Sequence, residues 1–123
     1  MDLRRLRWDV QQAQAHFPNV ELVDDGSGGL YARAALQTSV GQVYAITITF
    51  KGYPNEVPKV AVLPKVTHTK HMYNSGHICF MLPARWNPGR HDLTFVLGQT
   101  AVWLAKHEVY KVKGVWPGPS LSH

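Results

Sequence analysis

The sequence predicts an α+β fold with a helix, a four-stranded antiparallel meander, an irregular loop and a second helix. Three observations support this prediction. Apolar residues recur at helical spacing near both ends of the chain, and residues 43–50 alternate between apolar and polar or small side chains. The connections between the expected strands are short, which indicates antiparallel neighbours. A chain of 123 residues can bury a core of its own, so we predict a single domain over 1–123.

The first helix is expected over residues 2–16, with Asp2 as its N-cap and Phe17-Pro18 at its end. Its apolar stripe consists of Leu3, Leu6, Val10 and Ala13. Arg4, Arg5 and Arg7 fall mostly outside this stripe. They form either a solvated surface or a docking surface for an acidic partner, and the second alternative makes them candidate partner-binding residues.

Four strands are expected, each bounded by residues that favour turns. The third is the clearest, because its apolar residues Tyr44, Ile46, Ile48 and Phe50 all point to one side. That period of two is typical of a strand with one buried face. The expected strands cover residues 20–23, 30–36, 43–50 and 59–63.

The second helix is expected from about residue 93 to 110, after an N-cap at Asp92 and before a break at Gly114. An apolar tail, residues 115–118, is expected to fold back on the domain. The helix residues that would pack across the sheet are Leu93, Val96, Leu97, Ala101 and Leu104.

Composition narrows the classes of function. The net charge of +5 favours acidic partners, but the basic residues form no stripe with aromatic ones, so we expect no nucleic-acid partner. No run approaches the roughly 18 apolar residues of a membrane helix, and the basic N-terminus does not continue into a signal peptide. We therefore expect no membrane association. A single cysteine cannot form an internal disulfide, which favours a reducing, cytoplasmic setting.

The long loop between the fourth strand and the second helix is expected to carry the function, since such aperiodic stretches are unusual inside compact domains. It holds Cys79, the only cysteine, and three histidines, His68, His71 and His77. A lone cysteine is most often an inert buried side chain. A zinc site built from these four residues is a second alternative, but their spacing matches no recognised zinc motif. We expect neither a metal nor another cofactor.

A series of short motifs runs along the chain: Ile46–Phe50, Tyr53-Pro54, Pro58–Val60, His68, Gly76, Ile78-Cys79, and Trp86 with Pro88. Each motif is weak alone. In this order and at these spacings, the stretch from Tyr44 to Trp116 resembles the ubiquitin-conjugating enzyme (UBC) family. The resemblance implies a UBC-like fold in which the second helix is the crossover helix and Cys79 is the active-site cysteine.

Two departures from the family pattern are informative. The family usually has His-Pro-Asn ten to eight residues before the cysteine, where this chain has Thr69, Lys70 and His71. The chain also lacks the two later helices of eukaryotic members. Its stretch 103–118 resembles instead compact bacterial members from the short type II CBASS antiphage operons, which lack a dedicated activating enzyme.

The activity that this resemblance implies is acyl transfer. Cys79 would carry the C-terminal glycine of a protein, expected to be a cGAS-like nucleotidyltransferase, as a thioester that an amine attacks. His71 replaces the asparagine that typically supports the oxyanion, so it either donates to the oxyanion or only braces the loop. His77 either activates the amine or is merely exposed, and the route by which the amine loses its proton stays open. The residues expected to bind the substrate are Tyr73, Asn74, Ser75 and Gly76.

The expected partners follow from the same resemblance. Ligase-binding positions of the family hold Asn55 and Asn87-Pro88-Gly89 here, so no RING-type ligase is expected, while an activating enzyme could take part. Two alternatives stay open: a conjugating enzyme of a different bacterial ubiquitin-like system, and a non-catalytic UBC-like binding module. Such modules normally lack the cysteine. A papain-like hydrolase does not fit, because the cysteine does not open a long helix and no distant His/Asn pair is evident.

Overall fold

The structure, a computed structural model, describes residues 1–66, 71–73 and 75–118. The predicted α+β fold is confirmed, and its arrangement is consistent with a compact UBC-like fold. In chain order the elements are α1 (Leu3–Gln14), β1 (Glu21–Asp24), β2 (Leu30–Gln37), β3 (Val43–Thr49), β4 (Lys59–Leu63), the 3-10 helix η1 (Pro83–Arg85) and α2 (Leu93–Lys113).

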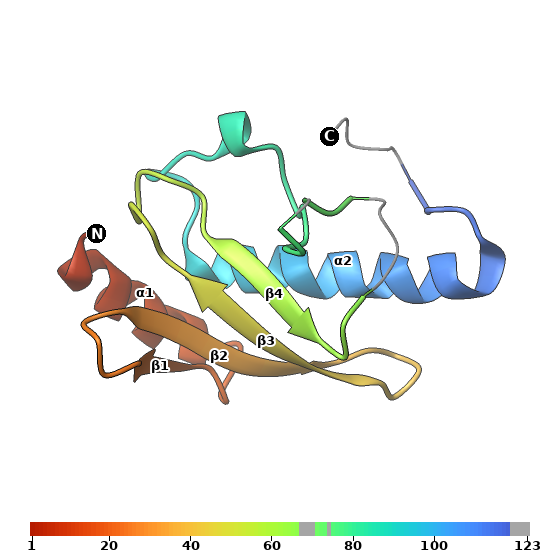
Figure 1. Ribbon diagram of the computed structural model, residues 1–123, viewed down its shortest axis with the longest axis horizontal. Helices are drawn as coiled ribbons and strands as arrows, with labels where there is room; N and C mark the ends of the chain where they lie inside the picture. The colour runs from red at the N-terminus through yellow and green to blue at the C-terminus, as the bar shows by residue number, and fades with distance from the viewer. Residues whose placement is uncertain (67–70, 74, 119–123) are drawn as a thin grey trace.

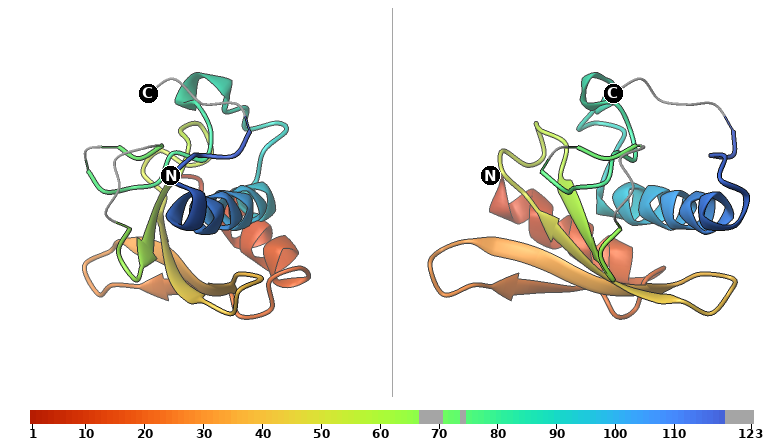
Figure 2. Two further views of the ribbon diagram at one scale, coloured as in Figure 1. Left: turned by 90° about the vertical axis from the view of Figure 1, so that its right-hand side faces the viewer. Right: turned by 45° about the vertical axis from the view of Figure 1, so that its right-hand side comes forward.

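The four strands form one antiparallel sheet in the order β1-β2-β3-β4, as the short connections predict. Both helices lie on the same face of this twisted sheet (Figure 1, Figure 2). In β3 the side chains of Tyr44, Ile46 and Ile48 are buried and their neighbours are exposed. Ile46 pairs with Ala34 of β2 and Val62 of β4, which are buried as well. The core therefore lies between the sheet and the two helices.

The predicted caps are confirmed. The Asp2 carboxylate accepts a hydrogen bond from the Arg5 N–H (3.0 Å), and the Asp92 carboxylate accepts one from the Phe95 N–H (2.9 Å). At the end of α2, Gly114 adopts the left-handed conformation (φ 72°), which a glycine reaches without steric cost.

Some predicted boundaries were wrong by a few residues. Helix α1 is shorter than the predicted 2–16, whereas α2 continues three residues beyond the predicted end, because the chain leaves the helix only at Gly114. Leu3, in the first turn of α1, is exposed, although the other three residues of the predicted stripe are buried. Ala101 of α2 is only partly buried.

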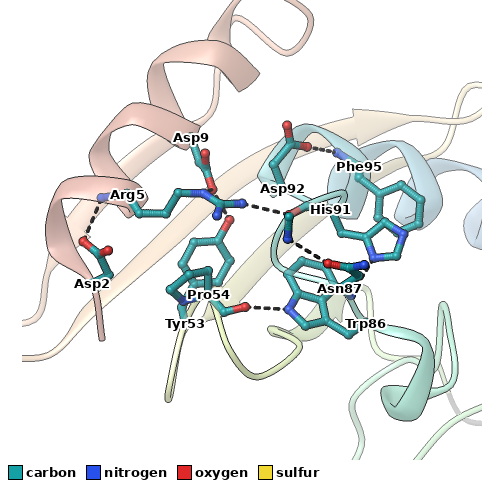
Figure 3. A network of polar contacts seen from close by, with 11 residues as sticks. Asp2, Arg5, Asp9, Tyr53, Pro54, Trp86, Asn87, His91, Asp92 and Phe95 are labelled. Carbon is teal, nitrogen blue, oxygen red and sulfur yellow. Dashed lines mark hydrogen bonds and ion pairs between the residues drawn. The ribbon is translucent and has the colours of Figure 1, made fainter.

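A polar network joins α1 to the connections before β4 and before α2 (Figure 3). The buried carboxylate of Asp9 accepts hydrogen bonds from Arg5 Nε (2.8 Å) and from the Tyr53 hydroxyl. Arg5 also donates to the carbonyl of His91 (2.9 Å), and Trp86 Nε1 donates to the carbonyl of Pro54 (2.7 Å). Burial, together with the hydrogen bond to Asp9, raises the pKa of Tyr53. The network anchors the chain on both sides of the cysteine loop.

This network also changes the interpretation of the predicted docking surface. Arg5 is partly buried, and its guanidinium is held by Asp9 and His91. Arg4 and Arg7 remain exposed on α1, beside Trp8, whose side chain is 59% exposed. Of the three candidate partner-binding residues, two therefore present their side chains to solvent. Within the described part of the chain, no helix is long and apolar enough to cross a membrane.

Candidate active site

The loop that carries the cysteine is attached to the sheet through Ile78. Its N–H donates to the carbonyl of Val60 in β4 (2.9 Å), and it forms isolated bridges with Val60 and with Met72. The Ile78 side chain is fully buried in the core. Because Cys79 is the next residue, its backbone position is set by this attachment.

The chain makes a turn just before the cysteine. The N–H of Gly76 donates to the carbonyl of Tyr73 (3.0 Å), and the N–H of Tyr73 donates to the carbonyl of His77 (2.9 Å). Gly76 has a φ of 86°, and among the described residues other than its chain neighbours no atom lies within 4 Å of the position where a Cβ would stand. The turn therefore needs glycine for its backbone conformation and leaves open space beside it. Asn74, also predicted to bind substrate, lies outside the described residues.

His77 points toward the turn. Its Nδ1 lies 2.7 Å from the hydroxyl oxygen of Ser75, and its ring is partly buried. Burial, and to a lesser extent the nearby positive charge of Lys59, lowers the pKa of His77. The ring of His77 is thus only partly exposed. It does not line the pocket of Cys79 that is described below.

Cys79 is only 1% exposed. Its N–H donates to the carbonyl of His71 (2.8 Å), and its Sγ lies 3.5 Å from the Tyr73 hydroxyl and 3.3 Å from the carbonyl of Met81. The sulfur nevertheless borders a pocket of about 250 Å³. Cys79 is therefore buried by its neighbours and lies against this pocket, which we call the cysteine pocket.

His71 has two structural roles in the cysteine pocket. Its carbonyl accepts hydrogen bonds from the N–H of Cys79 and from Trp103 Nε1 (3.2 Å), so its backbone does brace the loop. Its buried ring packs on Trp116, with ring centroids 4.6 Å apart, and lines the pocket beside Cys79. His71 also has a φ of 58°, a left-handed conformation that is uncommon for residues other than glycine. The backbone of His71 therefore braces the loop, which was one of the two alternatives for this residue, and its ring lines the same pocket as Cys79.

Four side chains of α2 line the cysteine pocket and were missed as site residues in the sequence: Gln99, Val102, Trp103 and Lys106. Each lies three or four positions from another member of the set, which places them on one face of the helix. That spacing was the available signal, but nothing in the sequence says which face meets the cysteine. Lys106 brings a cation to the pocket, and positive charge near a cysteine favours its thiolate.

The predicted return of the apolar tail is confirmed. Trp116 is buried and lines the cysteine pocket, and its ring contacts Trp103 (5.4 Å) and Tyr110 (6.1 Å) as well as His71. The tail thus forms one wall of the site. His71 and Trp116, which are in ring contact there, are 45 positions apart in the chain.

Glu108, on α2, is not one of the side chains that line the cysteine pocket. Glu108 accepts a hydrogen bond from the Tyr44 hydroxyl (2.5 Å), which is the main cause of its lowered pKa, and it pairs with Lys111 (3.4 Å). Its carboxylate is therefore engaged with Tyr44 and Lys111. His68 lies outside the described residues. Among the residues that are described, no three His, Cys, Asp or Glu side chains are grouped so that they could hold a metal ion.

Comparison with known proteins adds the family. The family model described as "E2-CBASS: Type II CBASS E2 protein" matches residues 9–123. The matched range includes the sheet, the cysteine loop, α2 and the tail, and it begins after the exposed arginines of α1. No curated protein matches the chain.

Proposed function

The chain belongs to the type II CBASS E2 protein family, and on that premise we propose that Cys79 carries the C-terminal glycine of another protein as a thioester and transfers it to an amine. The family gives the chain a conjugating-enzyme-like role in CBASS antiphage defence. The observation that carries the proposal is the cysteine pocket, in which Cys79, His71 and Lys106 line one cavity. A nucleophile, a hydrogen-bond donor and a cation are the groups that acyl transfer requires.

The reaction has two steps at the same sulfur. In the first, the Cys79 thiolate attacks the carbonyl carbon of an activated C-terminus, a C–S bond forms, and the activating group leaves. In the second, an amine attacks that carbon, the C–S bond breaks, and an amide forms while the amine gives up a proton. Each step passes through a tetrahedral oxyanion. We propose that the His71 ring donates to this oxyanion, with Gln99 and Lys106 on the same side of the pocket.

Burial of the sulfur is part of the proposal. Since Cys79 is 1% exposed, an acyl group reaches it only when a side chain around the pocket, such as Phe80 or Trp116, moves aside. The isolated protein should therefore react slowly with thiol reagents, and the acyl donor should arrive as a narrow chain end. A terminal glycine fits this requirement, because it has no side chain to clash with the wall.

We propose a CBASS protein as the acyl donor, with a cGAS-like nucleotidyltransferase ending in glycine as the first candidate, in the cytoplasm. The exposed Arg4 and Arg7, beside Trp8, would bind an acidic part of its folded body. Arg5 is left out of this surface, because its guanidinium is engaged with Asp9. Direct binding of this kind would make a RING-type ligase unnecessary. Activation of the C-terminus would come from another protein.

The test is to express the chain with the nucleotidyltransferase of its operon and to compare reducing with non-reducing gels and intact masses. Because Cys79 is the only cysteine, every thiol-labile adduct on this chain must be on it. We expect such an adduct with the wild type, a reductant-resistant ester or none with Cys79→Ser, and none when the last residues of the partner are deleted.

The outcomes also separate the alternatives. Conjugates formed by Cys79→Ala would refute the role of the sulfur. A stable complex without any adduct would indicate a non-catalytic binding module. An adduct to a small ubiquitin-like protein, with none to the nucleotidyltransferase, would indicate a different bacterial conjugation system.

A further inference from the structure

A second pocket, of about 430 Å³, lies next to the cysteine loop and has no place in the function proposed so far. One wall is formed by Val57, in the connection before β4, and by Lys59, the first residue of β4; the other is formed by Tyr73, Phe80 and Met81. We call it the side pocket. Most of these side chains are apolar, so the cavity suits an apolar group better than a charged one.

The side pocket adjoins the cysteine pocket. Phe80 lines both pockets, and the Tyr73 hydroxyl and the Met81 carbonyl lie 3.5 Å and 3.3 Å from Cys79 Sγ. The open space beside Gly76 adjoins the same loop. A chain whose end is bound to the sulfur would pass Tyr73 and Phe80 to reach the side pocket.

We propose that the side pocket binds a large apolar side chain of the acyl donor, two or three residues before its terminal glycine. This inference rests on the proposed function of Cys79. An extended chain covers about 3.3 Å per residue, so two or three residues span about 7–10 Å, the reach needed to cross one aromatic side chain. Successive side chains of an extended segment alternate in direction, so one of these two positions points into the pocket.

Charge favours the donor over the acceptor as the occupant. Lys59 and Glu56 both line the side pocket, and Lys106 lines the cysteine pocket, so the two pockets together carry an excess of positive charge. The activated C-terminal segment of the donor carries no ammonium group and is not repelled there, whereas the ammonium group of an incoming lysine is repelled. One apolar residue close to the C-terminus of the donor would then determine whether the enzyme accepts that donor.

The experiment uses synthetic peptides, which need no activating enzyme. Acetylated Xaa-Ala-Gly and Xaa-Ala-Ala-Gly thioesters of mercaptoethanesulfonate are incubated with the full chain, with Xaa as Leu, Ala or Asp. Cys79 sulfur bonds to the glycine carbonyl carbon, the bond to the mercaptoethanesulfonate sulfur breaks, and the released thiolate takes up the proton that Cys79 lost. Intact mass gives the loading rate, and subsequent addition of a lysine amine gives the discharge rate.

We expect at least one leucine peptide to load about tenfold faster than its alanine counterpart, as in other apolar specificity pockets. Val57→Phe, which fills the side pocket, should abolish this preference, and Asn55→Trp at its rim provides a second variant if the first does not fold. Val40→Phe is the matched control, because Val40 is 69% exposed in a turn away from both pockets. It should keep the preference.

Equal loading of leucine and alanine peptides would overturn the inference, as would a leucine preference that persists in both filled variants. Variants that load normally but discharge slowly would assign the side pocket to the acceptor instead. A wild type that no peptide acylates would contradict the proposed function of Cys79 itself, and the inference would fall with it. Loading with equal rates, by contrast, would leave that function intact.

Discussion

Replacement of His71 by alanine is the perturbation that tests the candidate site most directly. The ring of His71 lines the cysteine pocket, and we expect it to donate to the oxyanion. Loss of a single oxyanion donor slows acyl transfer by about a hundredfold or more in other enzymes. We therefore expect the alanine variant to discharge a preformed Cys79 thioester to an amine about a hundredfold more slowly than the wild type.

The same substitution should also cost stability, for two reasons that the structure gives. Alanine in the left-handed conformation that His71 adopts (φ 58°) costs about 1 kcal/mol. Loss of the ring contact with Trp116 costs about 1 kcal/mol more. The sum of about 2 kcal/mol corresponds to a fall of about 8 °C in Tm for a domain of this size.

His71→Asn separates the two effects. Asparagine tolerates the left-handed conformation and its carboxamide can donate a hydrogen bond. This variant should lose only the ring contact, about 1 kcal/mol, and keep its discharge rate within about tenfold of the wild type. To measure discharge, Cys79 is first loaded from a peptide thioester and lysine is then added, at a temperature well below the Tm of every variant. An alanine variant that discharges at the wild-type rate, or an asparagine variant as slow as alanine, would refute the donor role.

Three further predictions concern the frame of the site. Tyr53→Phe removes one of the hydrogen bonds to the buried carboxylate of Asp9 and should lower the free energy of unfolding, measured by urea titration, by about 1–3 kcal/mol. An unchanged urea midpoint would contradict the stabilising role of this network. Gly114→Ala should lower the stability by about 1 kcal/mol because Gly114 has a φ of 72°. Gly98→Ala should raise the stability by about 0.5–1 kcal/mol, because Gly98 lies inside α2 and no described side chain comes within 4 Å of its Cβ position. Thermal melts in which both variants shift Tm in the same direction would contradict this prediction. The hydrogen bond from Tyr44 lowers the pKa of Glu108 below its usual value of 4.5, so the ionised carboxylate stabilises the fold above pH 4.5, and this stabilisation is lost as the pH falls through the folded-state pKa. Tyr44→Phe should remove most of this acid dependence of stability between neutral pH and pH 3. Identical pH profiles of wild type and variant would disprove the role of the hydrogen bond.

The elements of this fold could be predicted from the sequence because the signals that specify them are local. Asp2 and Asp92 cap their helices through N–H groups three residues away, and Gly114 ends α2 through its own φ. The alternation in β3 has a period of two residues, so seven positions suffice to identify the buried face. Boundaries such as the end of α1 were less certain, since helix ends depend on what they pack against.

The candidate site divides in the same way. The loop residues Cys79, His71 and Tyr73 could be named from their order along the chain. Their surroundings could not, because Lys106 and Trp116 reach the sulfur only through the packing of α2 and the tail.

The same holds for the frame around the site. The sequence showed Arg5 as one of three similar cations on a helix, and only the structure ties it to a carbonyl 86 positions away and to a buried carboxylate. A charge that the fold encloses requires partners, and the packing of distant segments decides which groups come within reach of it.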